Sequence, residues 1–317
     1  MGDKTPFLLI SNCQVQPLKH GLSQVCRDVD IESFAVHVYS VEERETVIKQ
    51  VVQKKDHYKF VVTIPLSDDF GMLSSEKIAA SFHPTPVISI SNITYRGLHP
   101  DITYVGGISA RAPGPIGDYH SKVALLGFLM GLSVAQTVKL YCNKIYETLG
   151  FYAEFEESSL ELKRRDQNTT VPLGEDLEAS LQHGVAFLSH NHPTSVLLAP
   201  YVNKIAAWLA EQGLVRLTGL KLQPEEMINF LACSSVFPVY PEIVQRHNLP
   251  YEGSYIFRTA TLGDTPATPI GLYDFVAGEF EAFSHADRDF LLSSYPGNIL
   301  MFSFGNNEEF KQLVSSL

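Results

Sequence analysis

The sequence predicts an α/β protein with a mainly parallel, doubly wound sheet of the SGNH or flavodoxin type and large helical additions in its second half. Short apolar runs alternate with helical segments through the first hundred residues, which is the pattern of parallel strands joined by crossover helices. Strands are expected at residues 7–11, 34–39, 59–64 and 87–91. The segment 42–54 places Val47, Ile48 and Val51 on one face, as an amphipathic helix does.

Composition and charge narrow the class of protein. The 317 residues are 45% hydrophobic and 19% charged, with a net charge of −11, which argues against general nucleic-acid binding because that requires a basic face. No apolar run approaches the roughly 18 residues of a membrane span. The four cysteines form no CxxC pair and predict neither a disulfide framework nor a zinc site, so a reducing, cytoplasmic setting is expected. They are Cys13, Cys26, Cys142 and Cys233.

The second half of the chain is richer in helical patterns. A long loop is expected at 94–119, helices at 120–131, 133–149, 154–165 and 195–212, and a short strand at 185–188. We expect residues 1–212 to form the α/β core with the active site. Residues 213–317 are expected to be mostly helical, either separate or packed on the same domain.

A cysteine motif follows the first strand. The apolar run Phe7–Ile10 leads into Ser11-Asn12-Cys13-Gln14 and then a loop at 17–22 that enters a helix. Ligands of open α/β sheets bind at the carboxyl ends of strands, and a helix N-terminus there lowers the pKa of a thiol. Cys13 is therefore a candidate reactive thiolate. The alternative is a small buried hydrophobic residue, as free cysteines often are.

Three further polar clusters follow, two at the ends of apolar segments and one, Asp118–Ser121, at an expected helix entry. They are Asn92 with His99-Pro100-Asp101, Asp118-Tyr119-His120-Ser121, and His190-Asn191-His192. Imidazole removes hydroxyl protons near neutral pH, and a neighbouring carboxylate orients it. An ordinary turn is the alternative interpretation of residues 99–101.

Four of these motifs, in this order, resemble those of the WcbI-type polysaccharide-biosynthesis enzymes. They are Asn12-Cys13-Gln14, Gly97–Asp101 with Tyr104, Tyr119-His120-Ser121, and Asn191-His192-Pro193-Thr194. The resemblance covers Phe7 to Gln212, and the later segments 295–298 and 303–305 also look like that family. It implies a coenzyme A-binding acetyltransferase acting on a capsular sugar.

A looser likeness connects the chain with SGNH esterases and acyltransferases. Cys13, Asn92 and His192 would take the places of the nucleophile, the amide donor and the base. However, such enzymes carry an Asp three residues before the His, where this chain has Ser189. A Ser-His-Asp triad is therefore not supported.

The resemblance and the chemistry together suggest roles for the site residues. His192, or else His120, would deprotonate the sugar hydroxyl, while Gln14, Asn92 and the helix N–H groups after Cys13 stabilise the oxyanion. Cys13 either carries the acyl group transiently or only lines the thioester site, and direct transfer is favoured. The remaining candidates, His99, Asp101, His190 and Asn191, would order the long loop or hold the acceptor.

The phosphates of coenzyme A call for basic contacts. The tight basic run Lys163-Arg164-Arg165 is the first candidate, with Arg96 and Arg111 in the long loop as further options. Asn12 and Ser121 are expected to contact the coenzyme as well. The alternative interpretation of the basic run is a solvated helix face.

Two other function classes stay open. One is an SGNH-like esterase or thioesterase, in which water replaces the sugar as acceptor. The other is a non-catalytic coenzyme A- or sugar-binding component of a polysaccharide assembly complex. A metal site at His190 and His192 lacks an evident third ligand.

Overall fold

The computed structural model describes residues 4–106, 111–292, 303 and 306–317. Its contacts divide the chain into two compact units, each assembled from three separate stretches. Unit 1 comprises Met1–Thr94, Leu160–Phe187 and His192–Leu231, and unit 2 comprises Tyr95–Ser159, Leu188–Asn191 and Ala232–Leu317. The predicted division into residues 1–212 and 213–317 refers to domains and not to these units, and it stays a prediction. The motif segments at 295–298 and 304–305 lie outside the described residues.

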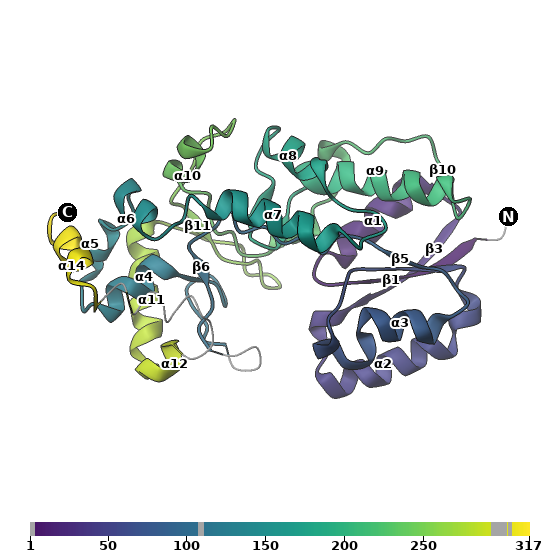
Figure 1. Ribbon diagram of the computed structural model, residues 1–317, viewed down its shortest axis with the longest axis horizontal. Coiled ribbons are helices and arrows are strands. Elements are labelled where there is room, and N and C mark those ends of the chain that lie inside the picture. The colour runs from purple at the N-terminus through teal and green to yellow at the C-terminus, as the bar shows by residue number, and fades with distance from the viewer. Residues whose placement is uncertain (1–3, 107–110, 293–302, 304–305) are drawn as a thin grey trace. The chain divides into compact units, whose positions relative to one another are not determined.

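Unit 1 is built on a four-stranded parallel sheet (Figure 1) with the order β3-β1-β4-β5. The strands are β1 (Thr5–Ser11), β3 (Val29–Ala35), β4 (Phe60–Thr63) and β5 (Val87–Ser89). β1 is central, and its run Phe7–Ile10 has no exposed surface, as expected for a strand covered on both faces. The strand order reverses between β1 and β4, which is the flavodoxin-like arrangement. The predicted α/β class is confirmed.

Helices cover both faces of this sheet (Figure 1). α1 (Val15–Val25) and α9 (Ser195–Glu211) lie on one face, and α2 (Val41–Gln53) and α3 (Ser75–Phe82) on the other. α1 and α9 approach closely at Gly21, where an added Cβ would lie 3.0 Å from the methyl groups of Val202. α2 begins with a capping box between Ser40 and Glu43.

Shorter elements lie in unit 1 or include residues of both units. β2 (Cys26–Arg27) pairs antiparallel with β10 (Arg216–Leu217), and α8 (Glu175–Leu181) precedes β8 (Phe187–Ser189) and β9 (His192–Pro193). α7 (Glu154–Asp166) confirms the amphipathic helix expected at 154–165. The 3-10 turns are η1 (Val36–Val38), η2 (Lys55–His57), η3 (Asp68–Leu73), η4 (Pro224–Glu226) and η5 (Phe230–Cys233). Of these elements, α7, β8 and η5 include residues of both units.

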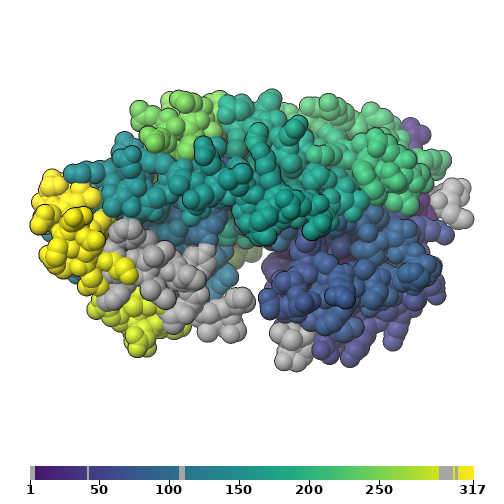
Figure 2. Space-filling view, in the orientation of Figure 1, coloured from purple at the N-terminus to yellow at the C-terminus, as the bar shows by residue number. Residues whose placement is uncertain are grey.

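Unit 2 is rich in short helices. Its helices are α4 (Lys122–Leu129), α5 (Val134–Val138), α6 (Asn143–Thr148), α10 (Pro241–Arg246), α11 (Leu272–Ser284), α12 (Arg288–Leu292) and α14 (Glu308–Ser315). Two antiparallel strand pairs accompany them, β6 (Ile102–Thr103) with β7 (His120–Ser121) and β11 (Phe257–Arg258) with β12 (Pro269–Ile270). α14, yellow in Figure 2, lies at the surface and buries Phe310.

Two predicted elements differ from the structure. The second strand is Val29–Ala35 rather than 34–39, because the polar residues Asp30, Glu32 and Ser33 interrupt it and it therefore contains no continuous apolar run. The helix expected at 133–149 is two helices, α5 and α6. They are separated where Leu140 and Tyr141 turn into the interior.

The starts of two helices also differ from the prediction. α1 begins at Val15, directly after the cysteine motif, and the expected loop at 17–22 is helical. Pro17 fits there because the first turn of a helix needs no N–H donor. His120 and Ser121 form β7 instead of opening a helix, and Ser121 caps α4 by accepting a hydrogen bond from the Ala124 N–H. In the part of the chain that the structure describes, no helix is both long and apolar enough to cross a membrane.

Candidate functional site

The cysteine motif lies at the topological switch point of the unit 1 sheet. β1 ends at Ser11 and α1 begins at Val15, so Asn12, Cys13 and Gln14 form the connection at the carboxyl end of β1. The neighbouring strand on the side where the order reverses is β4. Ligands of doubly wound sheets bind outside the strand ends at this place. The location that the sequence predicted for Cys13 is therefore the one at which this fold binds ligands.

The Asn12 side-chain amide lies next to the thiol and links it to Asn92. Asn12 Nδ2 donates to Asn92 Oδ1 at 3.0 Å, and Asn12 Oδ1 accepts from the Gln14 backbone N–H at 3.0 Å and lies 3.9 Å from the Cys13 Sγ. The buried Gln14 donates its Nε2 to the Ile93 carbonyl at 2.7 Å. We call Asn12, Cys13, Gln14 and Asn92 the Cys13 cluster. The structure thus brings Asn92 to three consecutive predicted site residues that lie about 80 positions earlier in the chain.

One member of the basic run contacts this cluster. Arg165 donates Nη1 to the Asn92 carbonyl at 2.9 Å and Nη2 to the Thr94 carbonyl at 2.8 Å. Lys163 and Arg164 instead form exposed ion pairs with Glu178 and Glu161. Lys163 and Arg164 therefore lie on a solvated helix face, as the alternative interpretation of the basic run expected, whereas Arg165 turns inward.

The protonation of Cys13 differs from the expectation. Burial raises the pKa of the Cys13 thiol to about 11, and the backbone N–H groups of Cys13 and Gln14, which lower it, do not compensate. The predicted lowering of the pKa by the helix N-terminus was wrong. The sequence places the thiol at a helix start, but its desolvation depends on how tightly the neighbouring segments pack over it.

Alkylation should reveal this elevated pKa. The rate at which iodoacetamide modifies Cys13 should rise about tenfold per pH unit between pH 7 and 9, because the thiolate is the nucleophile and its fraction grows at that rate below the pKa. Peptide-resolved mass spectrometry measures this rate, with the exposed Cys233 as an internal comparison. A rate for Cys13 that levels off below pH 8 would contradict the elevated pKa.

His192 belongs to the same compact unit as the Cys13 cluster. It forms β9 with Pro193 and directly precedes the N-terminus of α9. Thr194 secures this turn, since its hydroxyl donates to the Val185 carbonyl at 2.6 Å and accepts from the Val196 N–H at 3.3 Å. The half-buried His192 is therefore held on a short, anchored connection.

His120, in unit 2, is a buried ion-pair residue. Its ring is fully buried, with Nδ1 2.7 Å from Glu279 Oε2 and Nε2 3.0 Å from the Ala112 carbonyl oxygen. Burial lowers the pKa of His120, but the charge and hydrogen bond of Glu279 outweigh it and raise that pKa. Both ring nitrogens face oxygen atoms within the unit. Sequence reasoning missed Glu279, which lies 159 positions away on α11 without a local motif.

Asp101 and His99 are buried in unit 2. Asp101 accepts hydrogen bonds from the Val123 N–H at 2.9 Å and the Tyr240 hydroxyl at 2.6 Å, and its neighbour Lys122 donates to the Pro100 carbonyl. The His99 ring lies edge-on to Phe237. These contacts support the loop-ordering role of the two residues over that of acceptor contacts.

Ser121 and Arg96, two predicted coenzyme contacts in unit 2, form hydrogen bonds within that unit. Ser121 is fully buried, and its hydroxyl lies 2.6 Å from that of Tyr141. Arg96 donates to the Ile102 carbonyl at 3.0 Å. Both contacts hold the segment that surrounds β6 and β7.

His190 and Asn191 adjoin two tyrosines of the long loop in unit 2. Tyr104 Oη lies 3.2 Å from His190 Nε2, and the Tyr119 hydroxyl donates to Asn191 Oδ1 at 2.9 Å. Arg111 stacks on Tyr104, with its guanidinium carbon 3.7 Å from the ring centroid. Because His190 and Asn191 belong to unit 2 and His192 to unit 1, the predicted motif is divided between the units.

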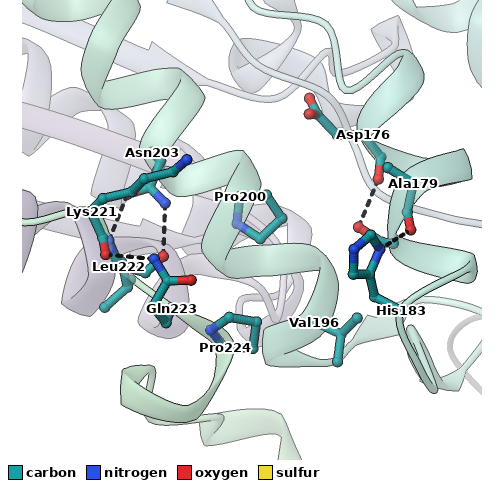
Figure 3. Close-up of a pocket in the computed structure, with 11 residues that line it drawn as sticks. Asp176, Ala179, His183, Val196, Pro200, Asn203, Lys221, Leu222, Gln223 and Pro224 are labelled. Carbon is teal, nitrogen blue, oxygen red and sulfur yellow. Dashed lines mark hydrogen bonds between the residues drawn. The ribbon is translucent and has the colours of Figure 1, made fainter.

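Unit 1 also contains a pocket away from the predicted residues. It has a volume of about 390 Å³ and lies between α8, α9 and the extended segment 221–224 (Figure 3). Its polar lining includes Asp176, His183, Asn203 and Lys221, and none of the predicted site residues lines it. Across the described ranges, no group of three His, Cys, Asp or Glu residues could hold a metal ion.

Fold and site define a doubly wound α/β protein with a thiol and three amides at its switch point. The family model for the polysaccharide biosynthesis enzyme WcbI matches residues 7–213. The chain therefore belongs to the WcbI family of polysaccharide biosynthesis enzymes, and the predicted resemblance is confirmed. The search of curated proteins found no match.

A solved structure of WcbI has the same fold as this chain. It matches with a TM-score of 0.68 and 15% sequence identity, and the alignment covers 98% of each chain. That protein is described as a novel polysaccharide biosynthesis enzyme, in a native form without a disulfide bond between coenzyme A and one of its cysteines.

Proposed function

We propose that this chain is an acyltransferase that moves an acyl group, acetyl in the simplest case, from coenzyme A to a sugar hydroxyl during polysaccharide synthesis. The Cys13 cluster at the switch point is the observation that carries the proposal. Membership of the WcbI family supports the polysaccharide substrate. The solved WcbI is described in relation to coenzyme A and one of its cysteines, in a form without a disulfide bond between them, and this supports the coenzyme.

The residues around Cys13 suit the reactive end of coenzyme A. Cys13 is half-buried and its raised pKa keeps it a neutral thiol near pH 7, so it does not repel the sulfur of a thiol or thioester. The amides of Asn12 and Asn92 offer hydrogen-bonding groups of the kind that a pantetheine arm pairs with. Lys163 and Arg164 could exchange their exposed ion pairs for phosphate contacts.

The catalytic roles are assigned to His192, which shares unit 1 with the Cys13 cluster, and to the amides of that cluster. His192 takes the proton of the sugar hydroxyl as its oxygen bonds to the acyl carbon, and returns it to the sulfur when the carbon–sulfur bond breaks. Asn92 accepts from Asn12 through Oδ1, so its Nδ2 donors point elsewhere and can stabilise charge on the acyl oxygen. Gln14 is committed to the Ile93 carbonyl and supports the cluster instead. Direct transfer uses Cys13 as a lining residue.

Calorimetry with coenzyme A and acetyl-coenzyme A at two salt concentrations tests this proposal. We expect micromolar binding of both compounds that weakens with salt, because phosphates are neutralised by basic side chains. Cys13→Ser should weaken binding, whereas Cys233→Ser, at an exposed cysteine, should bind as the wild type does. Absence of binding would overturn the proposal. Release of acetate from acetyl-coenzyme A at an undiminished rate without any sugar would favour a thioesterase.

A further inference from the structure

We infer that Arg165 is a positioning residue, which holds the segment after β5 so that Asn92 meets Asn12 beside Cys13. The sequence suggested that Arg165 contacts phosphate. Its geometry points to a different role. Any effect of this role on catalysis rests on the proposed function. The hydrogen bonds themselves can be tested without any coenzyme or substrate.

Three consecutive backbone carbonyls after β5 accept hydrogen bonds from side chains. Arg165 donates to the carbonyls of Asn92 and Thr94, and Gln14 donates to the Ile93 carbonyl between them. The donor–acceptor distances are 2.7 to 2.9 Å. The segment is not part of a strand or helix, so it lacks the regular backbone partners that buried peptide groups require. Side chains from two distant elements therefore determine where this segment lies.

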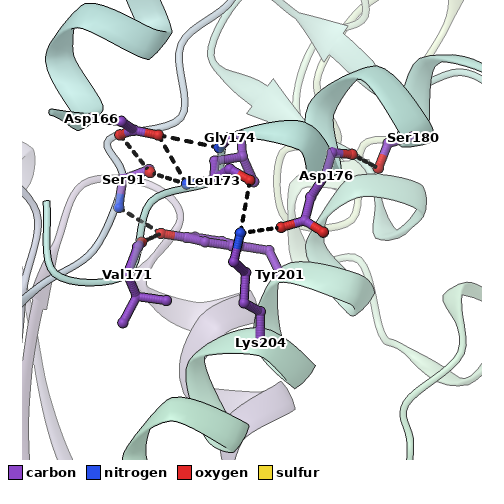
Figure 4. Close-up of polar contacts among 9 residues, drawn as sticks. All are labelled: Ser91, Asp166, Val171, Leu173, Gly174, Asp176, Ser180, Tyr201 and Lys204. Carbon is purple, nitrogen blue, oxygen red and sulfur yellow. Dashed lines mark hydrogen bonds and ion pairs between the residues drawn. The ribbon is translucent and has the colours of Figure 1, made fainter.

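Asp166, the residue after Arg165, holds Ser91, the residue before Asn92. Asp166 Oδ1 accepts from the Ser91 hydroxyl at 2.6 Å, and its Oδ2 accepts from the Leu173 N–H at 2.9 Å. The Tyr201 hydroxyl accepts from the Ser91 N–H and donates to the Val171 carbonyl, both at 2.6 Å. Figure 4 shows the Asp166 carboxylate bonded to the Ser91 side chain and the Tyr201 hydroxyl bonded to its backbone. The C-terminal end of α7 thus fixes the chain immediately before Asn92 as well as after it.

The shape of the guanidinium group explains why Arg occupies this position. Its planar fork presents two N–H groups to two carbonyls at once, which the single ammonium of Lys cannot match in direction. The side chain of Arg165 is 28% exposed and its Nε also lies 3.6 Å from Glu161 Oε1, while that of Arg164 is 68% exposed and its Nε lies 2.8 Å from Oε2 of the same Glu161. Arg164 therefore offers a matched control one position away.

Losing the fork should loosen the segment that holds Asn92 against Asn12, whose Oδ1 lies 3.9 Å from the Cys13 Sγ. Without the fork, the Asn92 and Thr94 carbonyls lose their donor, and the segment can shift away from Asn12. Water then reaches the thiol, and the burial that raises the pKa of Cys13 decreases. A lower pKa increases the thiolate fraction at a given pH.

The experiment compares Arg165→Lys with Arg164→Lys in the full chain, by peptide-resolved alkylation of all four cysteines from pH 7 to 10. We expect Arg165→Lys to speed modification of Cys13 at pH 8 about tenfold, which is one pKa unit. Cys26, Cys142 and Cys233 should not change, and Arg164→Lys should match the wild type. Arg165→Gln provides a second variant if the first folds poorly.

Two results would overturn the inference. One is an unchanged Cys13 profile in Arg165→Lys, and the other is an equal acceleration at all four cysteines, which would indicate general loosening. If Arg165 instead contacts phosphate, Arg165→Lys should weaken coenzyme A binding and reduce its salt dependence while the Cys13 profile stays the same. The alkylation result stands whether or not the chain binds coenzyme A, so it is distinct from the test of the proposed function.

Discussion

Replacing His192 with alanine should lower turnover of the proposed acyl transfer at least about a hundredfold, because general base catalysis typically contributes 10²–10⁴. The loss should appear in kcat, since the proton moves in the transition state and not on binding. Steady-state kinetics with acetyl-coenzyme A and an identified sugar acceptor measures it. Coenzyme A affinity from calorimetry should stay within a few-fold of the wild type.

His183→Ala is the matched control for this variant. His183 is an exposed histidine of unit 1 whose Nδ1 lies 2.6 Å from the Ala179 carbonyl oxygen, and it lines the separate pocket. Its replacement should leave turnover unchanged. A loss below tenfold in His192→Ala would remove His192 from the role of general base.

Glu279→Ala should destabilise the protein by about 3–5 kcal/mol, the cost of removing one partner of a buried ion pair. Both side chains of the pair with His120 have no exposed surface, so water cannot replace the lost carboxylate. Urea unfolding followed by circular dichroism measures the difference. Glu279→Gln keeps a hydrogen-bonding oxygen and should lose less.

Glu281→Ala provides the surface control for this measurement. Glu281 is exposed and lies on the same helix, α11, so its replacement should change stability by no more than about 0.5 kcal/mol. A loss in Glu279→Ala as small as that of Glu281→Ala would mean that the pair contributes little to the fold.

The His120–Glu279 pair should make the folded protein less stable as the pH rises. Burial raises the pKa of Glu279, and Glu279 raises that of His120 above its usual value. The folded protein therefore holds protons more tightly than the unfolded chain. The contribution of His120 to stability is fully present below its unfolded pKa and is lost as pH rises through the folded pKa. This dependence should be weaker in Glu279→Gln.

The sequence predicted the parts of the fold that local patterns encode. The central strand β1 is a continuous apolar run, and α2, α7 and α9 carry helical periodicity, so their positions were found within a few residues. The edge strand β3 was misplaced because polar residues interrupt it. The break between α5 and α6 was missed because it depends on Tyr141 turning inward toward Ser121.

The candidate site divides in the same way. Cys13 could be located from the sequence because a strand end followed by a helix start is a local feature, and the family motifs mark the same residues. Whether its thiol ionises depends on burial, which segments distant in the chain produce. Glu279 and the two carbonyls bound by Arg165 likewise have no local signal. The fold class, the family and the position of the thiol could all be predicted from the sequence, since short stretches of residues encode each of them. Which charges are buried, which side chains pair and how the thiol is protonated became known from the structure alone, because desolvation and hydrogen-bond geometry arise where remote segments pack together.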